Sequence, residues 1–165
     1  SGESDMDGMG ESISNGLEVI QENGKTRIKV NAKNSEVSYV IDGIEYAADS
    51  LKNGIPDEIA TVNMITSPTN AKKSYVVINT KQKKGQFISY ANGVLKYKYN
   101  KQEYTLNPEK LEEPALVINN RLTRSFNIDP VQIIQIRPAS ELERQLLGAP
   151  SAQVIIVTDK MGFFF

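Results

Sequence analysis

Short segments in which apolar and polar residues alternate run through most of the chain and are separated by turn-forming pairs. Segment 17–30 alternates on both sides of an Asn-Gly pair at 23–24, and segment 94–106 alternates around an Asn-Lys pair at 100–101. A period of two residues is typical of a β-strand. Asn-Gly is a strong hairpin signal because both central residues of the tight turn need positive φ. We therefore predict a β-hairpin in each segment, with a looser turn at 100–101, where lysine replaces glycine.

Two further hairpins are predicted downstream of these. Segment 38–46 contains an Asp-Gly pair, and segment 115–123 contains an Asn-Asn pair at the corresponding place. Each is followed by an aliphatic, β-branched run, 75–80 in the first half and 153–158 in the second. These runs are too apolar to be exposed on both faces, so we expect them to be buried strands.

Helical signals are few and short. Residues 140–147 form the best one, because Ser140 can cap the first turn and Gly148 can end the helix. The equivalent stretch of the first half, 67–73, has no helical pattern, and 49–53 is long enough for one turn only. Strands with a few helices predict an α+β fold, with two tandem β-rich repeats, each a small mixed sheet with one or two short helices.

The two halves of the chain resemble each other at an offset of 77 positions, which gives seven identities without a gap over 15–43. The order of turn pairs, Val-Ile pairs and aliphatic runs is also the same in both halves. Such self-similarity indicates a tandem duplication. Two unrelated β-rich stretches that share turn residues are the alternative. The predicted organisation is a flexible leader at 1–12, repeat 1 at 13–85 and repeat 2 at 86–165.

The leader is acidic, rich in glycine and poor in branched apolar residues. Asp5, Asp7 and Glu11 are spaced by glycines in a way that partly matches a calcium-binding loop. A complete loop needs further oxygen ligands and a bidentate acid at its end, and these are missing. The prediction is a flexible tail.

Composition limits the chemistry that the chain can perform. Net charge is −1, and cysteine and histidine are both absent. The chain therefore lacks the thiol nucleophile, the usual base near neutral pH and the common zinc ligands. Acids at 42, 49, 57 and 58 have no acidic counterparts in the second half. We predict that the protein is not an enzyme and has no catalytic residues, metal site or cofactor. No apolar run is long enough for a transmembrane helix.

Part of each half carries a longer motif, in which an aliphatic strand and a turn pair precede Pro-x-x-Ile and a β-branched run that ends in threonine. The motif spans 39–81 and again 116–160. It resembles the plug module of Bacteroidetes outer-membrane proteins. That module occurs in TonB-dependent transporters and at the C-terminus of BlaR-type membrane regulators. The resemblance implies a periplasmic or outer-membrane-associated protein of the cell envelope.

Binding is the remaining class of function. Tyrosines and lysines of 90–104 would suit stacking on nucleic acid. A net charge near zero and strict alternation instead favour a sheet with its tyrosines on the half-buried face and its lysines on the exposed face. No nucleic-acid partner is therefore predicted. Instead, sheet edges at 17–30 and 94–106, or a groove, would take up a protein or peptide partner by strand addition. The predicted partner-binding residues are Lys96, Tyr97, Lys98, Tyr99, Arg121 and Arg124.

The predicted function is thus a non-catalytic binding or scaffolding module of a cell-envelope protein. Two alternatives remain open at this point. One is a plug-like fragment of a TonB-dependent transport or signalling system, and the other is a structural spacer domain.

Overall fold

The computed structural model describes residues 11–14, 17–30, 36–51, 53–55, 57–81 and 88–159. These residues divide into two compact units, with unit 1 extending to Thr80 and unit 2 beginning at Lys81. The predicted leader lies outside the described residues up to position 10, and its last two residues belong to the first strand.

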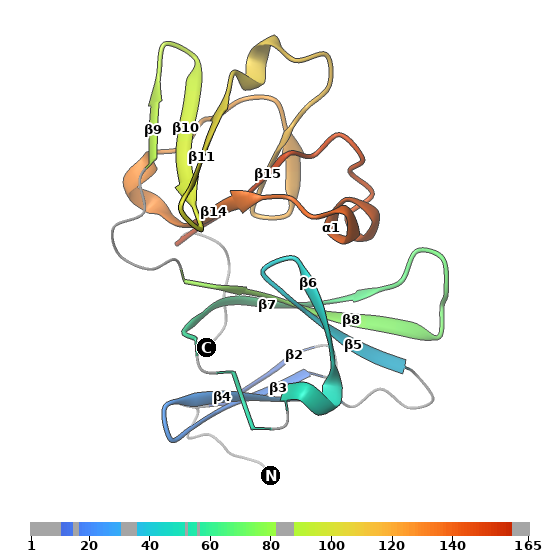
Figure 1. Cartoon of the computed structure of the whole chain (residues 1–165). Helices are drawn as coiled ribbons and strands as arrows, with labels where there is room; N and C mark the ends of the chain where they lie inside the picture. Colours follow the sequence, from blue (N-terminus) through green and yellow to red (C-terminus); the bar gives the residue numbers. More distant parts are fainter. Residues whose placement is uncertain are drawn as a thin grey trace. The chain divides into compact units, whose positions relative to one another are not determined.

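Unit 1 contains two sheets (Figure 1). The first is an antiparallel sheet with the order β2-β3-β4, formed by β2 (Glu11–Ser14), β3 (Leu17–Glu22) and β4 (Lys25–Val30). The second has the order β6-β5-β8-β7 and is formed by β5 (Glu36–Ile41), β6 (Ile44–Ala47), β7 (Ile59–Thr66) and β8 (Lys73–Thr80). Strands β5 and β8 are parallel, and the other neighbours are antiparallel. A 3-10 turn, η1 (Ala48–Leu51), follows β6.

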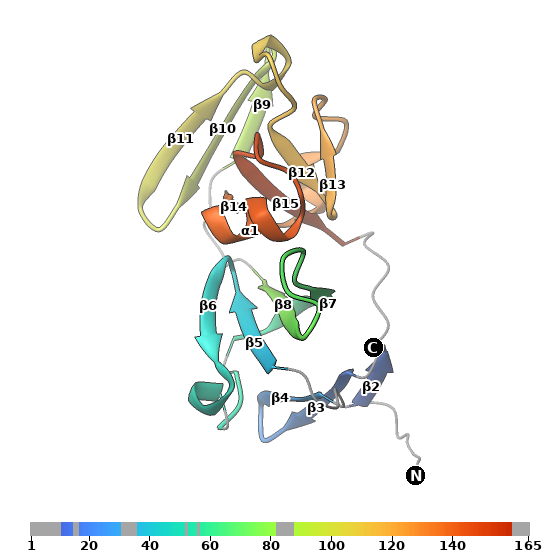
Figure 2. The same cartoon turned by 90° about the vertical axis from the view of Figure 1, so that its right-hand side faces the viewer.

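Unit 2 repeats this arrangement of strands (Figure 2). Its antiparallel sheet has the order β11-β10-β9, formed by β9 (Ile88–Ala91), β10 (Val94–Tyr99) and β11 (Gln102–Leu106). Its mixed sheet has the order β13-β12-β15-β14, formed by β12 (Leu116–Ile118), β13 (Arg121–Thr123), β14 (Ile133–Pro138) and β15 (Val154–Thr158). Strands β12 and β15 are parallel. The helical segments are η2 (Pro108–Lys110), η3 (Pro130–Gln132) and α1 (Glu141–Leu146).

The predicted α+β class is wrong. Strands make up 53% and helical residues 13% of the structure, and α1 is the one α-helix among the described residues. Two physical reasons explain the error. The proline-led segment at 130–132 forms a single 3-10 turn before strand β14 begins. In addition, a second sheet, which the sequence showed only as a hairpin, supplies apolar side chains to the core of each unit.

The core of unit 2 lies between its two sheets and is rich in aromatic side chains. Leu95 and Tyr97 of β10 pack with buried residues of the mixed sheet, among them Leu116, Ile136 and Ile156. The tyrosine ring stacks on the ring of the neighbouring strand, Tyr104, with 4.9 Å between centroids. This core explains why the apolar positions of β10 alternate so strictly.

The core of unit 1 is more aliphatic. Its buried cluster includes Tyr39 of β5 and Val76 and Ile78 of β8, and Ile28 of β4 packs against it. Val76 and Ile78 have no exposed surface. These β-branched residues lie on the strand that the sequence predicted to be buried.

Each predicted two-residue turn that the structure describes has positive φ at both central positions. Asn23 and Gly24 have φ of 54° and 75°, and Asn100 and Lys101 have 50° and 68°. The prediction of a looser turn at 100–101 is wrong, because the flanking residues of β10 and β11 pair directly across it. Lys101 therefore adopts a left-handed conformation that costs a residue with a side chain about 1 kcal/mol or more.

A polar clasp joins the turn of each second hairpin to the end of the parallel strand beside it. In unit 1 the Asp42 carboxylate accepts hydrogen bonds from the Thr80 backbone N–H (2.9 Å) and from its hydroxyl (2.6 Å). In unit 2 the Asn119 side chain accepts from the Thr158 N–H (3.0 Å) and donates to its hydroxyl oxygen (2.9 Å). In both units, therefore, the first residue of the turn pair and the terminal threonine of the sequence motif bind each other.

Helix α1 of unit 2 is capped and anchored by charge. The predicted helix at 140–147 is confirmed, because Ser140 and Glu143 form a reciprocal capping box. The Glu143 carboxylate also accepts two hydrogen bonds from Arg137 of β14, each 2.6 Å long. The side chain of Glu143 is 5% exposed and that of Arg137 is 1% exposed. Gln135 accepts a further bond from the guanidinium at 2.8 Å. Breaking a buried pair of this kind on one side costs several kcal/mol.

We expect Lys101→Gly to stabilise the protein by about 1 kcal/mol, because glycine adopts positive φ without steric cost. Urea unfolding of unit 2 measures the change. The matched variant Lys101→Ala keeps the strain and should show no gain. An equal gain in both variants would contradict this explanation.

We expect Asp42→Ala to destabilise unit 1 by about 2 kcal/mol, because the Thr80 N–H and hydroxyl lose a charged acceptor. Asp42→Asn should cost much less, since unit 2 forms the same clasp with Asn119. Urea unfolding distinguishes the two variants. Equal stability of Asp42→Ala and Asp42→Asn would show that the clasp is unimportant.

Candidate functional site

The structure places the predicted partner-binding residues of β10 on opposite faces of a central strand. Tyr97 is 2% exposed and belongs to the core, and Tyr99 packs partly buried against the same core. Lys96 is exposed on the other face, where Lys98 lies 3.8 Å from Glu103. Strand β10 is paired on both sides, so it offers no free edge for a partner strand. The hairpins at 17–30 and 94–106 are parts of three-stranded sheets.

The two predicted arginines have different environments. Arg121 is exposed on β13, an outer strand of the mixed sheet. Arg124 donates to the Leu111 carbonyl and, at 2.9 Å, to the Glu112 carbonyl, so it holds the loop before β12. The six predicted residues therefore do not form one exposed cluster.

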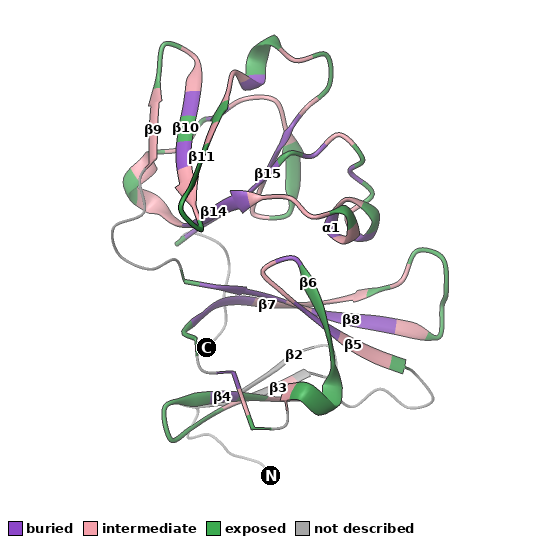
Figure 3. Cartoon of the chain, viewed as in Figure 1, coloured by how far each residue is buried: buried purple, intermediate pink, exposed green. Residues whose placement is uncertain are grey.

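An open sheet edge lies in unit 1. All four residues of β6 are exposed, as Figure 3 shows along the strand, and β6 pairs only with β5 within its sheet. Ile44 is 59% exposed and Tyr46 is 37% exposed, and they are two of the four exposed large apolar side chains among the described residues. A strand with one unpaired edge presents backbone donors and acceptors beside apolar surface.

Four other edge strands carry features that oppose pairing. The edge strands β7 and β14 each contain a β-bulge near their first residue, and β14 ends in Pro138. Strand β13 has only three residues. In β4, Thr26 exchanges backbone hydrogen bonds with Ile55 of the loop, at 3.2 and 2.7 Å. Bulges, proline, short strands and covering loops protect sheet edges, and β6 has an uninterrupted register and no proline.

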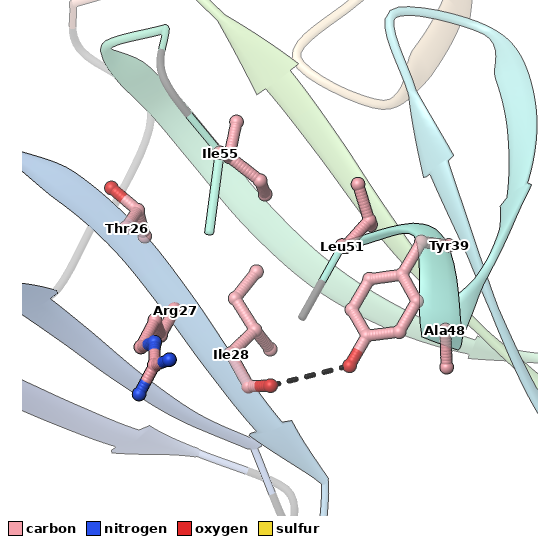
Figure 4. A pocket seen from close by; sticks show the side chains of 7 residues that line it. All are labelled: Thr26, Arg27, Ile28, Tyr39, Ala48, Leu51 and Ile55. Carbon is pink, nitrogen blue, oxygen red and sulfur yellow. Dashed lines mark hydrogen bonds between the residues drawn. The ribbon is translucent and has the colours of Figure 1, made fainter. Parts of the chain in front are cut away.

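A hollow of about 340 Å³ opens in the same unit and is mostly apolar (Figure 4). Its residues come from β4, β5, the η1 turn and the loop that follows. They are Thr26, Arg27, Ile28, Tyr39, Ala48, Leu51 and Ile55.

Tyr39 places a phenol in the hollow, and its hydroxyl is already engaged. The ring points across the hollow, and the hydroxyl donates to the Ile28 carbonyl at 3.3 Å. The residue is 7% exposed, and this burial raises the pKa of the Tyr39 phenol above its ordinary value. The tyrosine thereby links the two sheets of unit 1 across one wall of the hollow.

Gly54 determines the position of the opposite wall. Its φ is 90°, and a Cβ at this position would lie 3.1 Å from the Thr26 carbonyl oxygen. A residue with a side chain would be strained at this φ and would press against β4 beside the bridge between Thr26 and Ile55. The glycine keeps Ile55, which is 4% exposed, against the core.

The apolar surface extends from the hollow to the open edge. Tyr46 pairs with Tyr39 and Ile44 pairs with Ile41, so these side chains share one face of the sheet. A segment added to β6 would place every second side chain on this face. The hollow and the edge therefore form one candidate site, called here the β6 site.

Acidic residues lie along β6 and η1, while the basic residue Arg27 lines the hollow. Residues 42–51 contain three acids and no base. Glu45 lies 3.4 Å from Lys73, and Asp49, in the first turn of η1, is exposed. The described residues contain no group of three or more side chains suited to hold a metal ion.

Sequence reasoning placed 44–46 in a short return strand but missed its importance. The alternation of Ile44 and Tyr46 predicts a face directed at the core. It does not show that the other sheet of unit 1 leaves that face open.

No protein-family model, curated protein or solved structure matches this chain. The part of the chain that the structure describes contains no helix long and apolar enough to cross a membrane.

The raised pKa of Tyr39 predicts a pH dependence. Because the folded pKa exceeds the unfolded value of roughly 10, its stabilising contribution is complete below that pH and decreases as pH rises above it. We expect the stability advantage over Tyr39→Phe to shrink between pH 8 and about pH 11. Urea unfolding at both pH values measures it, and the pH 8 value isolates the lost hydrogen bond, about 1 kcal/mol. A constant difference would contradict the prediction.

Proposed function

We propose that this protein is a non-catalytic binding module that captures an extended segment of a partner protein by strand addition to β6. The observation that carries the proposal is the open β6 edge, on which Ile44 and Tyr46 remain 59% and 37% exposed. Main-chain hydrogen bonds would supply affinity, and alternate side chains would supply specificity.

The register of the hairpin identifies the backbone groups involved. Ile41 and Ile44 flank the two-residue turn and form the first hydrogen-bonded pair with each other. Glu45 then belongs to a pair without hydrogen bonds to β5, so its N–H and carbonyl point to the free side. Ala47 has the same orientation two residues later. The Ala47 carbonyl, however, already accepts a 2.7 Å hydrogen bond from the Ser50 hydroxyl. The edge therefore offers two outward N–H donors, those of Glu45 and Ala47, and the outward carbonyl of Glu45 to an added strand.

The cell envelope is the proposed location, on the basis of the plug-like motif at 39–81 and 116–160. Within that setting, capture of an extended segment suits a module that links a transport or signalling protein to its partner. A spacer domain without a ligand would have no use for an open apolar edge, so the exposed β6 favours the binding function.

The variant Glu45→Pro tests the proposal. It removes the outward N–H while the hydrogen bonds between β5 and β6 are kept, and proline is tolerated on an edge strand in this orientation. Peptides are first selected on the intact chain from a random displayed library. We expect Glu45→Pro to weaken their binding at least about tenfold, as loss of a hydrogen bond of about 1.4 kcal/mol implies.

The control is Glu45→Thr, which removes the charge and keeps the N–H. Urea unfolding checks that both variants are folded, and NMR of the labelled chain shows whether the peptide shifts the amide signals of Glu45 and Ala47. Selected peptides that bind Glu45→Pro as tightly as the unmutated chain would refute strand addition at β6.

A further inference from the structure

We infer that the segment captured at the β6 site carries a large aromatic side chain, which enters the hollow, and a lysine or arginine beside Asp49. This inference rests on the proposed function and specifies the chemistry of its ligand. Size, polarity, the comparison with unit 2 and charge each support it.

The size of the hollow suits an aromatic ring. A cavity of about 150 Å³ is large enough to bind benzene, and the hollow in unit 1 measures about 340 Å³. An indole or phenol ring would therefore fit, and a valine side chain would leave much of the space unfilled. Unfilled space loses the dispersion contacts that a ring would make.

The polar groups around the hollow are already paired, which disfavours a charged occupant inside it. The Tyr39 hydroxyl donates to Ile28, and the Thr26 N–H and carbonyl are both bonded to Ile55. Arg27 points away from the tyrosine and lies 3.3 Å from Glu22. A buried charge would find no free partner among these groups, at a cost of several kcal/mol.

In unit 2 the equivalent loop supplies an aromatic side chain of the chain itself to the core. The loop between β13 and β14 contributes Phe126, which is 6% exposed and stacks on Tyr90 with 4.5 Å between centroids. The loop between β6 and β7 contributes Leu51 and Ile55 to unit 1, and neither is aromatic. Apart from the ring of Tyr39 on β5, the loop of unit 1 therefore supplies no aromatic side chain, whereas the loop of unit 2 does.

The acidic residues near the β6 edge indicate which residue type flanks the aromatic side chain of the captured segment. The β6 edge and η1 lie within residues 42–51, which carry acids only. Asp42 is held in the clasp and Glu45 lies beside Lys73, but Asp49 is exposed at the start of η1, next to the Ala48 wall of the hollow. A basic residue near the aromatic anchor would complement it and orient the segment.

Tryptophan fluorescence provides a direct test, because the chain contains no tryptophan. The probe is acetyl-Lys-Thr-Trp-Thr-Val-Lys-amide. We expect its emission to shift to shorter wavelength on binding, as the indole leaves water. The same peptide with valine in place of tryptophan should compete at least about tenfold more weakly, which corresponds to about 1.4 kcal/mol.

Two variants locate the ring and the charge. Leu51→Phe fills the hollow and should abolish the emission shift, whereas its control Leu122→Phe, on the exposed strand β13, should not. Asp49→Lys should weaken binding about tenfold at low salt, with the difference vanishing near about 1 M salt, where the Debye length is about 3 Å. Its control is Asp159→Lys in unit 2, which should bind normally.

The outcomes separate this inference from the proposed function. If the valine peptide competes as well as the tryptophan peptide, or if Leu51→Phe leaves the emission shift intact, the aromatic pocket is refuted while strand addition at β6 stands. An Asp49→Lys variant that binds normally refutes the basic flank. If neither peptide shifts the amide signals of Glu45 and Ala47, strand addition fails as well.

Discussion

The parallel pairing of a hairpin strand with the last strand of each mixed sheet is the constraint on which the rest of the structure depends. Two parallel strands cannot be joined by a tight turn, so the chain must cross over before it returns. Here an antiparallel strand, β7 or β14, forms part of that crossover. The clasp between Asp42 and Thr80 then holds the end of the pairing in register. Since β6 follows directly from this turn, the clasp also determines where the open edge lies.

The two units show how one topology supports different properties. Both have the strand order of an antiparallel three-stranded sheet beside a mixed four-stranded sheet. Unit 2 fills its interior with stacked rings and covers part of its sheet with α1. Unit 1 has aliphatic residues at its loop and retains a hollow of about 340 Å³. The units differ in their strands as well as in their loops, and the residues that line the hollow come from β4, β5, η1 and the loop after it.

Local features of the fold could be predicted from the sequence, and those that depend on distant neighbours could not. Turn pairs such as Asn-Gly at 23–24 indicated hairpins correctly, because positive φ is a local requirement. The helix at 140–147 was equally clear from its cap. Alternation in β10 showed that Tyr97 and Lys98 lie on opposite faces, but not that the tyrosine is buried. Nor could it reveal that β9 pairs with β10 and removes its edge, because strand order is set by contacts between segments far apart in the chain.

Under the predicted tandem duplication, the buried pair of Arg137 and Glu143 would also restrict how the two units diverged. Asn63 of β7 and Arg137 of β14 occupy equivalent positions. Each follows the residue that pairs with a central isoleucine of the neighbouring strand, Ile78 in β8 and Ile156 in β15. The stretch between β7 and β8 forms a turn where unit 2 has α1. Gain or loss of the helix without a matching change in β14 or β7 would leave an unpaired charge in the interior. A lineage passing between the two forms must therefore alter both segments together, or pass through an uncharged intermediate at the strand position.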